Sequence, residues 1–353
     1  MEYRTLGRTG LEVSAIGLGM EHMLKHSPEE MAAVLDAAVA GGITYIDLLY
    51  EGGEFWAKFG SLLRAYQGRF CYAAHWGGPN DYEAEYCKRS FEGMLEALGA
   101  DHVPIAMITM VDTMAKWRIM RPQVEETMLG YKEQGVIGAI AVSGHHGPTA
   151  VKMIQTGLID VLMHPVGLTA PTAGADKVQA PDRLAPVFAA CQEQGVGLVA
   201  MKAYAGGMLL NPQHSQATPV QCLHYVLSQP VATVAVGVQS ADEVHAALEY
   251  YTCAEEAREY GPASETLALH DWDACTQCLH CLPCPNGIDV PEIMRLAFMA
   301  RWKLSPAAEL RAEYAALQAK ASDCEECHTC LERCAFGVDI MERMATAREV
   351  LEG

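Results

Sequence analysis

Eight short apolar segments, separated by longer amphipathic stretches, make up most of the first 250 residues. Each segment is largely free of charged residues until its end, as is typical of strands that are buried on both faces of a parallel sheet. The segments begin at Val13, Ile43, Arg69, His102, Ile137, Asp160, Val196 and Val231. The pattern therefore predicts eight buried, parallel β-strands.

The stretches between these segments carry the signals that start and stop helices. The clearest begins at residues 27–30, where Ser27 can cap the helix, Pro28 takes its first position and two glutamates follow. Apolar residues then recur from Met31 to Ala38, and Gly41 ends the run. Similar helices are expected at 81–98, 122–134, 182–194, 218–228 and 240–250. Strands alternating with helices predict an α/β fold, specifically a closed (β/α)8 TIM barrel.

An open doubly wound sheet is the competing architecture. Such sheets carry a G-x-G-x-x-G turn after the first strand, whereas this chain has Gly17-Leu18-Gly19-Met20 there. In a TIM barrel, the reactive groups lie on the loops that follow the strands. The polar residues at those ends are Asp47, Tyr50, Glu51, His75, Thr109, Ser143, His145, His146, His164 and Lys202.

Histidine at several strand ends indicates a functional pocket, although a single such histidine is commonly a structural hydrogen-bonding residue. A metal ion bound by His75, His145 and His164 is an alternative, but no close-spaced pair of ligands supports it.

The composition changes near residue 265, where the strand-like segments stop and cysteines appear in two bursts. Amphipathic helices are expected around them at 291–302 and 306–321. We therefore place a domain boundary near residue 262, with a barrel over 1–262 and a smaller α-helical domain over 263–353.

The two bursts have the spacing of iron–sulfur ligands. Their members are Cys275, Cys278, Cys281 and Cys284, followed by Cys324, Cys327, Cys330 and Cys334. In ferredoxins with two clusters, the fourth cysteine of each run ligates the other cluster. One 4Fe-4S cluster would then take the first three cysteines with Cys334, and the other would take Cys324, Cys327 and Cys330 with Cys284. Two tetrahedral zinc sites are the alternative, although zinc ribbons usually show two separated pairs.

The overall composition narrows the classes of function. The chain has 353 residues, 50% of them hydrophobic, and a net charge of −19. Such a surface repels phosphate backbones and anionic lipids, which argues against nucleic-acid and membrane partners. No apolar run reaches the roughly 20 residues that span a bilayer, and the first residues carry no hydrophobic signal core. We expect a cytoplasmic protein.

Several segments together resemble the aldo/keto reductases, specifically the branch with a C-terminal ferredoxin-like domain. The similar segments are residues 3–14, 41–47, 137–145, 200–207 and 231–244. This resemblance implies hydride transfer between NADP(H) and a carbonyl group. It also implies cofactor-binding roles for Ser143, Gly237, Ser240 and Glu243.

The family uses a tetrad of Asp, Tyr, Lys and His, and the resemblance carries over only in part. Asp47 matches the Asp, and Tyr50, which begins a Y-x-G-G-E motif, matches the Tyr. His75 stands at the Lys position and Thr109 at the His position. Losing the lysine removes a fixed positive charge beside the tyrosine, which a His75 imidazolium would partly replace.

These features together predict an iron–sulfur oxidoreductase that passes electrons between its clusters and a small organic substrate in the barrel mouth. Proton transfer would fall to Asp47, Tyr50 and His75, and substrate binding to Thr109, His145, His164 and Lys202. A ferredoxin or flavodoxin is the expected redox partner. The alternatives are a redox-neutral lyase or isomerase that uses the same pocket, and a non-catalytic electron-transfer subunit.

Overall fold

The larger part of the protein is a closed barrel of eight parallel strands, as the sequence predicts. The computed structural model describes residues 1–49, 53–78, 82–168, 180–210, 217–260, 275, 281–301, 307–334 and 338–353. The barrel strands are β3 (Ile16–Gly19), β4 (Tyr45–Leu48), β5 (Cys71–Trp76), β6 (Val103–Ile108), β7 (Ile137–Ser143), β8 (Val161–Pro165), β9 (Gly197–Met201) and β10 (Thr233–Gly237). Each pairs with the next, and β10 closes the ring against β3.

Alternate residues of each strand point into the barrel and out toward the helices. The inner layer includes Tyr45, Ile105 and Val199, all fully buried. Gly17 of β3 makes room for Tyr45, because a Cβ atom at residue 17 would lie 2.7 Å from its ring. The barrel interior is therefore a packed core.

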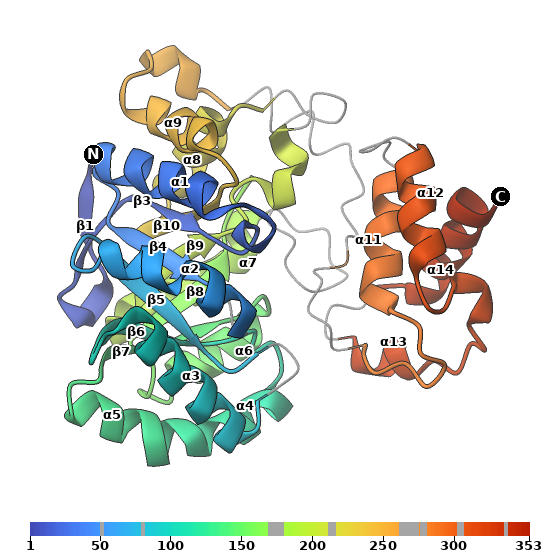
Figure 1. Ribbon diagram of the computed structural model, residues 1–353, viewed down its shortest axis with the longest axis horizontal. Helices are drawn as coiled ribbons and strands as arrows, with labels where there is room; N and C mark the ends of the chain where they lie inside the picture. The colour runs from blue at the N-terminus through green and yellow to red at the C-terminus, as the bar shows by residue number, and fades with distance from the viewer. Residues whose placement is uncertain are drawn as a thin grey trace.

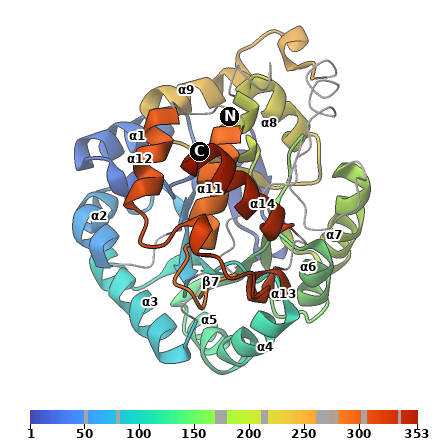
Figure 2. The same cartoon turned by 90° about the vertical axis from the view of Figure 1, so that its right-hand side faces the viewer.

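Helices surround the barrel, as Figure 2 shows from the end where the strands finish. They are α1 (Pro28–Ala40), α2 (Gly53–Ala65), α3 (Ala84–Leu98), α4 (Met114–Gln123), α5 (Leu129–Glu133), α6 (Gly147–Ile154), α7 (Ala180–Gln194), α8 (Pro219–Leu227) and α9 (Ala241–Leu248). The predicted start of α1 is confirmed, since Ser27 and Glu30 form a reciprocal capping box.

The helix predicted at 122–134 begins earlier than expected. Thr113 accepts a hydrogen bond from the Lys116 backbone N–H, which starts α4 at Met114. Pro122 therefore lies inside a helix instead of starting one, and a π-helical turn at Val124–Met128 follows it directly. The prediction of a start at residue 122 was wrong because proline is also tolerated where the hydrogen-bond pattern changes.

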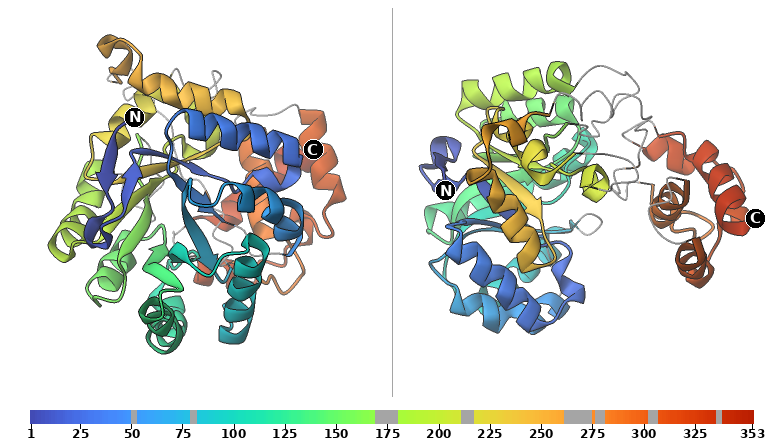
Figure 3. Two further views of the ribbon diagram at one scale, coloured as in Figure 1. Left: turned by 60° about the vertical axis from the view of Figure 1, so that its left-hand side comes forward. Right: turned by 90° about the horizontal axis from the view of Figure 1, so that it is seen from above.

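A short antiparallel hairpin covers the other end of the barrel (Figure 3, left). It consists of β1 (Tyr3–Thr5) and β2 (Glu12–Ser14). The first apolar segment, predicted as one strand, is thus divided between this hairpin and β3. Leu6 and Val13 are fully buried in the inner core and close this end. The carboxyl ends of the strands are left as the open face.

A second, helical part follows the barrel and has its own core. Its helices are α11 (Val290–Arg301), α12 (Ala307–Ala316), α13 (Thr329–Arg333) and α14 (Ile340–Ala347). Ile293, Leu310 and Met344 are buried between them. In Figures 1 and 3 this part lies on the side where the barrel strands end. The predicted boundary at residue 262 lies outside the described residues.

Helices α11 and α12 match the two predicted at 291–302 and 306–321, although α12 ends earlier, at Ala316. Among the helices that the structure describes, none is long and apolar enough to cross a membrane.

Candidate active site

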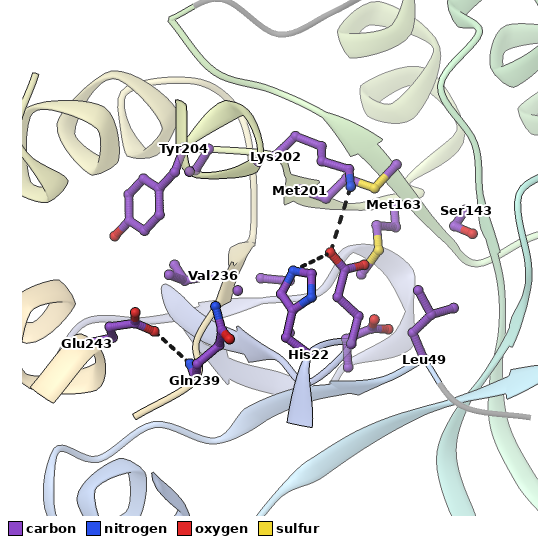
Figure 4. Close-up of a pocket in the computed structure, with 18 of the residues that line it drawn as sticks. His22, Leu49, Ser143, Met163, Met201, Lys202, Tyr204, Val236, Gln239 and Glu243 are labelled. Carbon is purple, nitrogen blue, oxygen red and sulfur yellow. Dashed lines mark hydrogen bonds and ion pairs between the residues drawn. The ribbon is translucent and has the colours of Figure 1, made fainter. Parts of the chain in front are cut away.

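A cavity of about 240 Å³ opens to solvent at the carboxyl ends of the barrel strands. Polar residues from several strand ends line it beside an apolar surface rich in methionine (Figure 4). The polar side chains are Glu21, His22, Asp47, His75, Ser143, His145, Lys202, Tyr204, Gln239 and Glu243, and the methionines are Met110, Met163 and Met201. Five of the ten predicted strand-end residues therefore meet in one pocket: Asp47, His75, Ser143, His145 and Lys202.

A chain of buried hydrogen bonds lies at the pocket floor. His75 Nε2 lies 3.0 Å from Asp47 Oδ1, and His75 Nδ1 lies 2.9 Å from Thr109 Oγ1. The Thr109 hydroxyl itself donates to the backbone carbonyl of Gly77. Thr109 Oγ1 must therefore accept a hydrogen bond from an N–H at His75 Nδ1. Asp47 contacts the other nitrogen, so the two contacts together fix the orientation of the His75 ring.

This arrangement assigns different roles to the three residues. Asp47 and His75 line the pocket, whereas Thr109 is only 1% exposed and does not reach it. Thr109 therefore positions His75, and the structure does not support the predicted contact between Thr109 and substrate. Tyr50, the predicted proton donor, and Glu51 lie outside the described residues.

A second polar cluster, which the sequence analysis missed, lies on the other side of the pocket. Glu21 Oε1 lies 3.1 Å from His22 Nε2 and 3.8 Å from Lys202 Nζ (Figure 4). The hydrogen bond with His22 and the charge of Lys202 lower the pKa of Glu21 to about 2. Both missed residues directly follow the first barrel strand, so their place at a strand end was the signal that could have found them.

His145 lies in the pocket as predicted, held by a buried carboxylate. Its Nδ1 lies 3.1 Å from Asp112 Oδ2, and its backbone N–H donates to the other carboxylate oxygen. Asp112 follows β6 and is another residue that the sequence analysis missed. Ser143 also lines the pocket, where its Oγ accepts a hydrogen bond from the Met110 backbone N–H at 2.8 Å.

His164 does not line the pocket, although it lies near the end of a barrel strand, β8. Met163 points inward and lines the cavity, so alternation places His164 on the outer face of β8. His164 is fully buried, and its Nδ1 donates to the Gly144 carbonyl at 2.8 Å. Burial lowers its pKa to about 4. Its predicted contact with substrate therefore has no support in the structure.

Three of the four residues that the family resemblance assigns to the cofactor lie near α9, whereas Ser143 ends β7. Gly237 and Glu243 line the cavity, whereas Ser240 caps α9 by accepting the Glu243 backbone N–H. Lys202 is the only lysine or arginine among the described pocket residues, and it faces Glu21. A 2′-phosphate such as that of NADP(H) would thus meet Glu243 without a cation at this end, and the residues present do not fit it.

Four predicted cluster ligands line one small pocket in the helical part. They are Cys284, Cys324, Cys327 and Cys330, the set expected to share the second 4Fe-4S cluster. Four thiolates around one cavity fit the ligand chemistry of such a cluster. Cys275, Cys281 and Cys334 pack against the same helical core, and Cys278 lies outside the described residues.

Within the described part of the chain, no three histidine, cysteine, aspartate or glutamate side chains are close enough together to hold a metal ion. The three-histidine metal site is therefore not formed there, because His75 and His145 line the pocket whereas His164 does not. By the same finding, the four cysteines line one cavity, but their side chains are not close enough together to hold a metal ion.

Known proteins resemble this chain over its barrel. The model of the aldo/keto reductase family matches residues 15–221, which is more than half of the chain. The uncharacterized oxidoreductase YrpG of Bacillus subtilis (strain 168) is 27% identical over 238 residues, covering 59% of this chain and 68% of that protein. The L-glyceraldehyde 3-phosphate reductase of Escherichia coli (strain K12) is 27% identical over 232 residues, covering 59% and 63%.

A solved structure shows the same fold. The aldo-keto reductase AKR11C1 from Bacillus halodurans, in its holo form, superposes with a TM-score of 0.60 and 21% identity, covering 76% of this chain and 96% of that one. The strand order, the pocket at the carboxyl ends of the strands and the match over residues 15–221 lead to one assignment. The chain belongs to the aldo/keto reductase family of oxidoreductases.

Proposed function

We propose that this protein is an iron–sulfur oxidoreductase that reduces a small carbonyl compound in the barrel mouth with electrons from two 4Fe-4S clusters. The observation that carries the proposal is the buried chain from Asp47 through His75 to Thr109. In the proposal, His75 serves as an imidazolium cation at the pocket floor, at the position where the family resemblance implies a lysine. A cation there favours the negative charge that develops on the proton donor or on the carbonyl oxygen.

Each candidate active-site residue has a distinct role in the proposal. Tyr50 donates a proton to the carbonyl oxygen, and the charge of His75 lowers the cost of forming the tyrosinate. Asp47 supplies the counter-charge that keeps the imidazolium in a buried site, and Thr109 fixes the orientation of the ring. His145, oriented by Asp112, and Lys202 hold the substrate.

Reduction of a carbonyl group to an alcohol consumes two electrons and two protons. Iron–sulfur clusters, if bound, would supply such electrons one at a time, and a ferredoxin or flavodoxin would be the electron donor. Cys284, Cys324, Cys327 and Cys330 would hold one cluster, and Cys275, Cys278, Cys281 and Cys334 the other. Thiols remain available as ligands in a reducing compartment, which is why we place the protein in the cytoplasm.

The substrate class follows from the pocket and from one relative. The E. coli relative is named for reduction of L-glyceraldehyde 3-phosphate, and the pocket here combines polar groups with Lys202. A short, polar aldehyde is therefore the class of substrate that we propose.

The test uses the full-length protein, purified and reduced without oxygen and then freed of the reductant. After mixing with DL-glyceraldehyde 3-phosphate, we expect the visible absorption of oxidised clusters to return and glycerol 3-phosphate to form. The yield should be one product molecule for every two electrons lost. Cys330→Ala should lose this reaction. Product formation without cluster oxidation would contradict the proposal, and any conversion of the aldehyde without a change in redox state would favour the lyase or isomerase.

A further inference from the structure

We propose that His145, oriented by Asp112, is a second proton donor of the pocket and delivers a proton to the carbonyl carbon of the substrate. This inference rests on the proposed function, because it concerns the same reduction. It goes further by assigning the hydrogen atom that the product gains at carbon, whereas Tyr50 serves the oxygen.

The need for a second donor follows from the source of the electrons. A hydride donor brings the hydrogen and both electrons to the carbonyl carbon in one step, whereas a one-electron donor such as a reduced iron–sulfur centre brings no hydrogen. Reduction of an aldehyde R–CHO to R–CH₂OH then takes two electrons from that donor and two protons from acids of the pocket. A tyrosine that has protonated the oxygen has given up its only proton when the carbon needs one.

The two protons are used in separate steps. One electron and the proton for oxygen convert the aldehyde to a neutral radical. The second electron and a proton from the His145 imidazolium form the C–H bond, while an N–H bond of the ring breaks and leaves a neutral imidazole. Solvent returns the proton to His145 after the product leaves.

Asp112 and His145 form a buried pair in the loops after the neighbouring strands β6 and β7. His145 Nδ1 lies 3.1 Å from Asp112 Oδ2, and Asp112 also accepts the His145 backbone N–H. The two residues are 1% and 2% exposed, yet His145 lines the cavity. Because the carboxylate engages Nδ1, exchange of a proton with a ligand falls to Nε2. The carboxylate also stabilises the imidazolium form of the ring.

The backbone around this pair holds it in place. The backbone N–H groups of Met110 and Val111 donate to Oγ and to the carbonyl of Ser143, at 2.8 and 2.7 Å. Gly144 permits this close approach, because a Cβ there would lie 2.8 Å from the Val111 carbonyl oxygen and 3.4 Å from Asp112 Oδ1. Met110 has a left-handed φ of 49°, a strained conformation of the kind that persists where the surrounding structure fixes it.

The pocket therefore contains two pairs of aspartate and histidine. Asp47 and His75 end β4 and β5, and β6 separates β5 from β7. The strands that carry His75 and His145 are thus about 10 Å apart, twice the usual strand spacing. A carbonyl group fits between two side chains at that separation, with its oxygen beside His75 and its carbon beside His145.

The charges around His145 favour its imidazolium form. The hydrogen bond with His22 is the main reason for the low pKa of Glu21, and the charge of His145 lowers that pKa further. Asp112 and Glu21 are thus two carboxylates that stabilise a positive charge on His145. Among the described pocket residues, His22 and Lys202 also carry N–H groups, but both pair with Glu21. An ammonium also releases a proton less readily than an imidazolium.

The first experiment follows the hydrogen that arrives at carbon. The full-length protein is purified and reduced without oxygen, freed of the reductant and mixed with DL-glyceraldehyde 3-phosphate in D₂O. We expect each glycerol 3-phosphate molecule to gain one deuterium at the former carbonyl carbon, on a single face, as measured by mass spectrometry and NMR.

Variants connect this label to His145. His145→Gln should slow product formation by about 10²–10⁴-fold, and the product that still forms should carry deuterium on both faces. His146→Gln is the matched control, since it removes the next imidazole along the chain. His146 is half-buried, lies 2.8 Å from Thr149 Oγ1 and does not line the pocket. This control should keep the rate and the single labelled face.

A second experiment needs no turnover. In the oxidised protein, labelled with ¹⁵N in its histidines, glycerol 3-phosphate should shift the imidazole signal that is absent from His145→Gln. The signal that is absent from His146→Gln should not move.

The inference is overturned if the product carbon is unlabelled, if His145→Gln keeps the normal rate and a single labelled face, or if the His145 signal does not move. The label is measured on the unaltered protein, so an unlabelled product decides the question even if His145→Gln does not fold. Any of these results overturns this inference alone. If no glycerol 3-phosphate forms at all, the proposed reduction itself fails, and this inference fails with it.

Discussion

His75 Nε2 lies 3.0 Å from Asp47 Oδ1, and this contact joins the ends of two neighbouring strands at the floor of the pocket. Both side chains are almost fully buried. Replacing one partner of a buried ion pair leaves the other charge uncompensated. The pair is therefore a fixed feature of the active site. The residues that contact it, such as Thr109, orient the His75 ring.

Thr109 provides a direct test of this arrangement, because it contacts His75 without reaching the pocket. Thr109→Val keeps the shape of the side chain and removes the acceptor for His75 Nδ1–H. Turnover of DL-glyceraldehyde 3-phosphate should fall by about 10- to 100-fold with little change in KM, as for other groups that orient a functional side chain.

Thr109→Ser is the matched control, since it retains the hydroxyl group. It should keep most of the turnover and the pH profile of the unaltered protein, while the profile of Thr109→Val shifts. Equal losses in the two variants would show that Thr109 matters for packing alone.

Tyr50→Phe tests the proposed proton donor. Removing the hydroxyl should lower turnover by about 10²–10⁴-fold, the usual contribution of a general acid, with the cluster absorption unchanged. Tyr72→Phe is the control, because Tyr72 carries its hydroxyl on the same kind of ring and donates to the Leu63 carbonyl outside the pocket. Normal turnover by Tyr50→Phe would transfer the proton-donor role to a histidine of the pocket, His22 or His145.

The order of strands and the place of the pocket could be predicted from the sequence, because buried parallel strands and helix caps leave strong local patterns. The capping residues around Ser27 predicted a helix that the structure contains. The direction of side chains at the strand ends could not be predicted. A strand buried on both faces, such as β8, shows no polar alternation, so nothing in the sequence tells that Met163 points inward and His164 outward.

The hydrogen-bond and ion-pair partners of the pocket residues could not be predicted from the sequence either. Glu21 lies 3.8 Å from Lys202, which is 181 residues further along the chain. Asp112 and His145 likewise come together only because β6 and β7 are neighbours in the closed barrel. These pairings depend on barrel closure, which brings distant segments to one end without a local signal.

Cys330→Ala tests the cluster assignment. The unaltered protein, purified without oxygen, should contain about eight irons, and the variant should lose about half of them, because Cys330 belongs to only one predicted set. Cys253→Ala makes the same change at a half-buried cysteine of the barrel part and should keep all of the iron. Zinc without iron in the anaerobic protein would contradict the assignment.

The fourth prediction concerns His164 and the pH dependence of stability. Burial first, and then the charge of His145, lower its pKa from 6.5 to about 4. The unfolded chain therefore takes up a proton below pH 6.5, whereas the folded protein resists protonation until about pH 4. The contribution of the neutral His164 to the free energy of unfolding is therefore fully present above pH 6.5. It is lost as the pH falls from 6.5 to about 4.

His164→Asn should remove this dependence, because an asparagine amide can still donate to the Gly144 carbonyl but does not titrate. Between pH 7 and pH 5 the unaltered protein should lose about 2 kcal/mol more unfolding free energy than the variant. Urea unfolding under anaerobic conditions, followed by tryptophan fluorescence, measures the free energy of unfolding of the unaltered protein and of the variant at each pH. His102→Asn is the control, since His102 also bonds a backbone carbonyl, that of Gly135, but is exposed. If His164→Asn and the unaltered protein lose equal stability over this range, then water or local opening reaches the ring, and His164 is not the neutral, buried donor that its contact with Gly144 indicates.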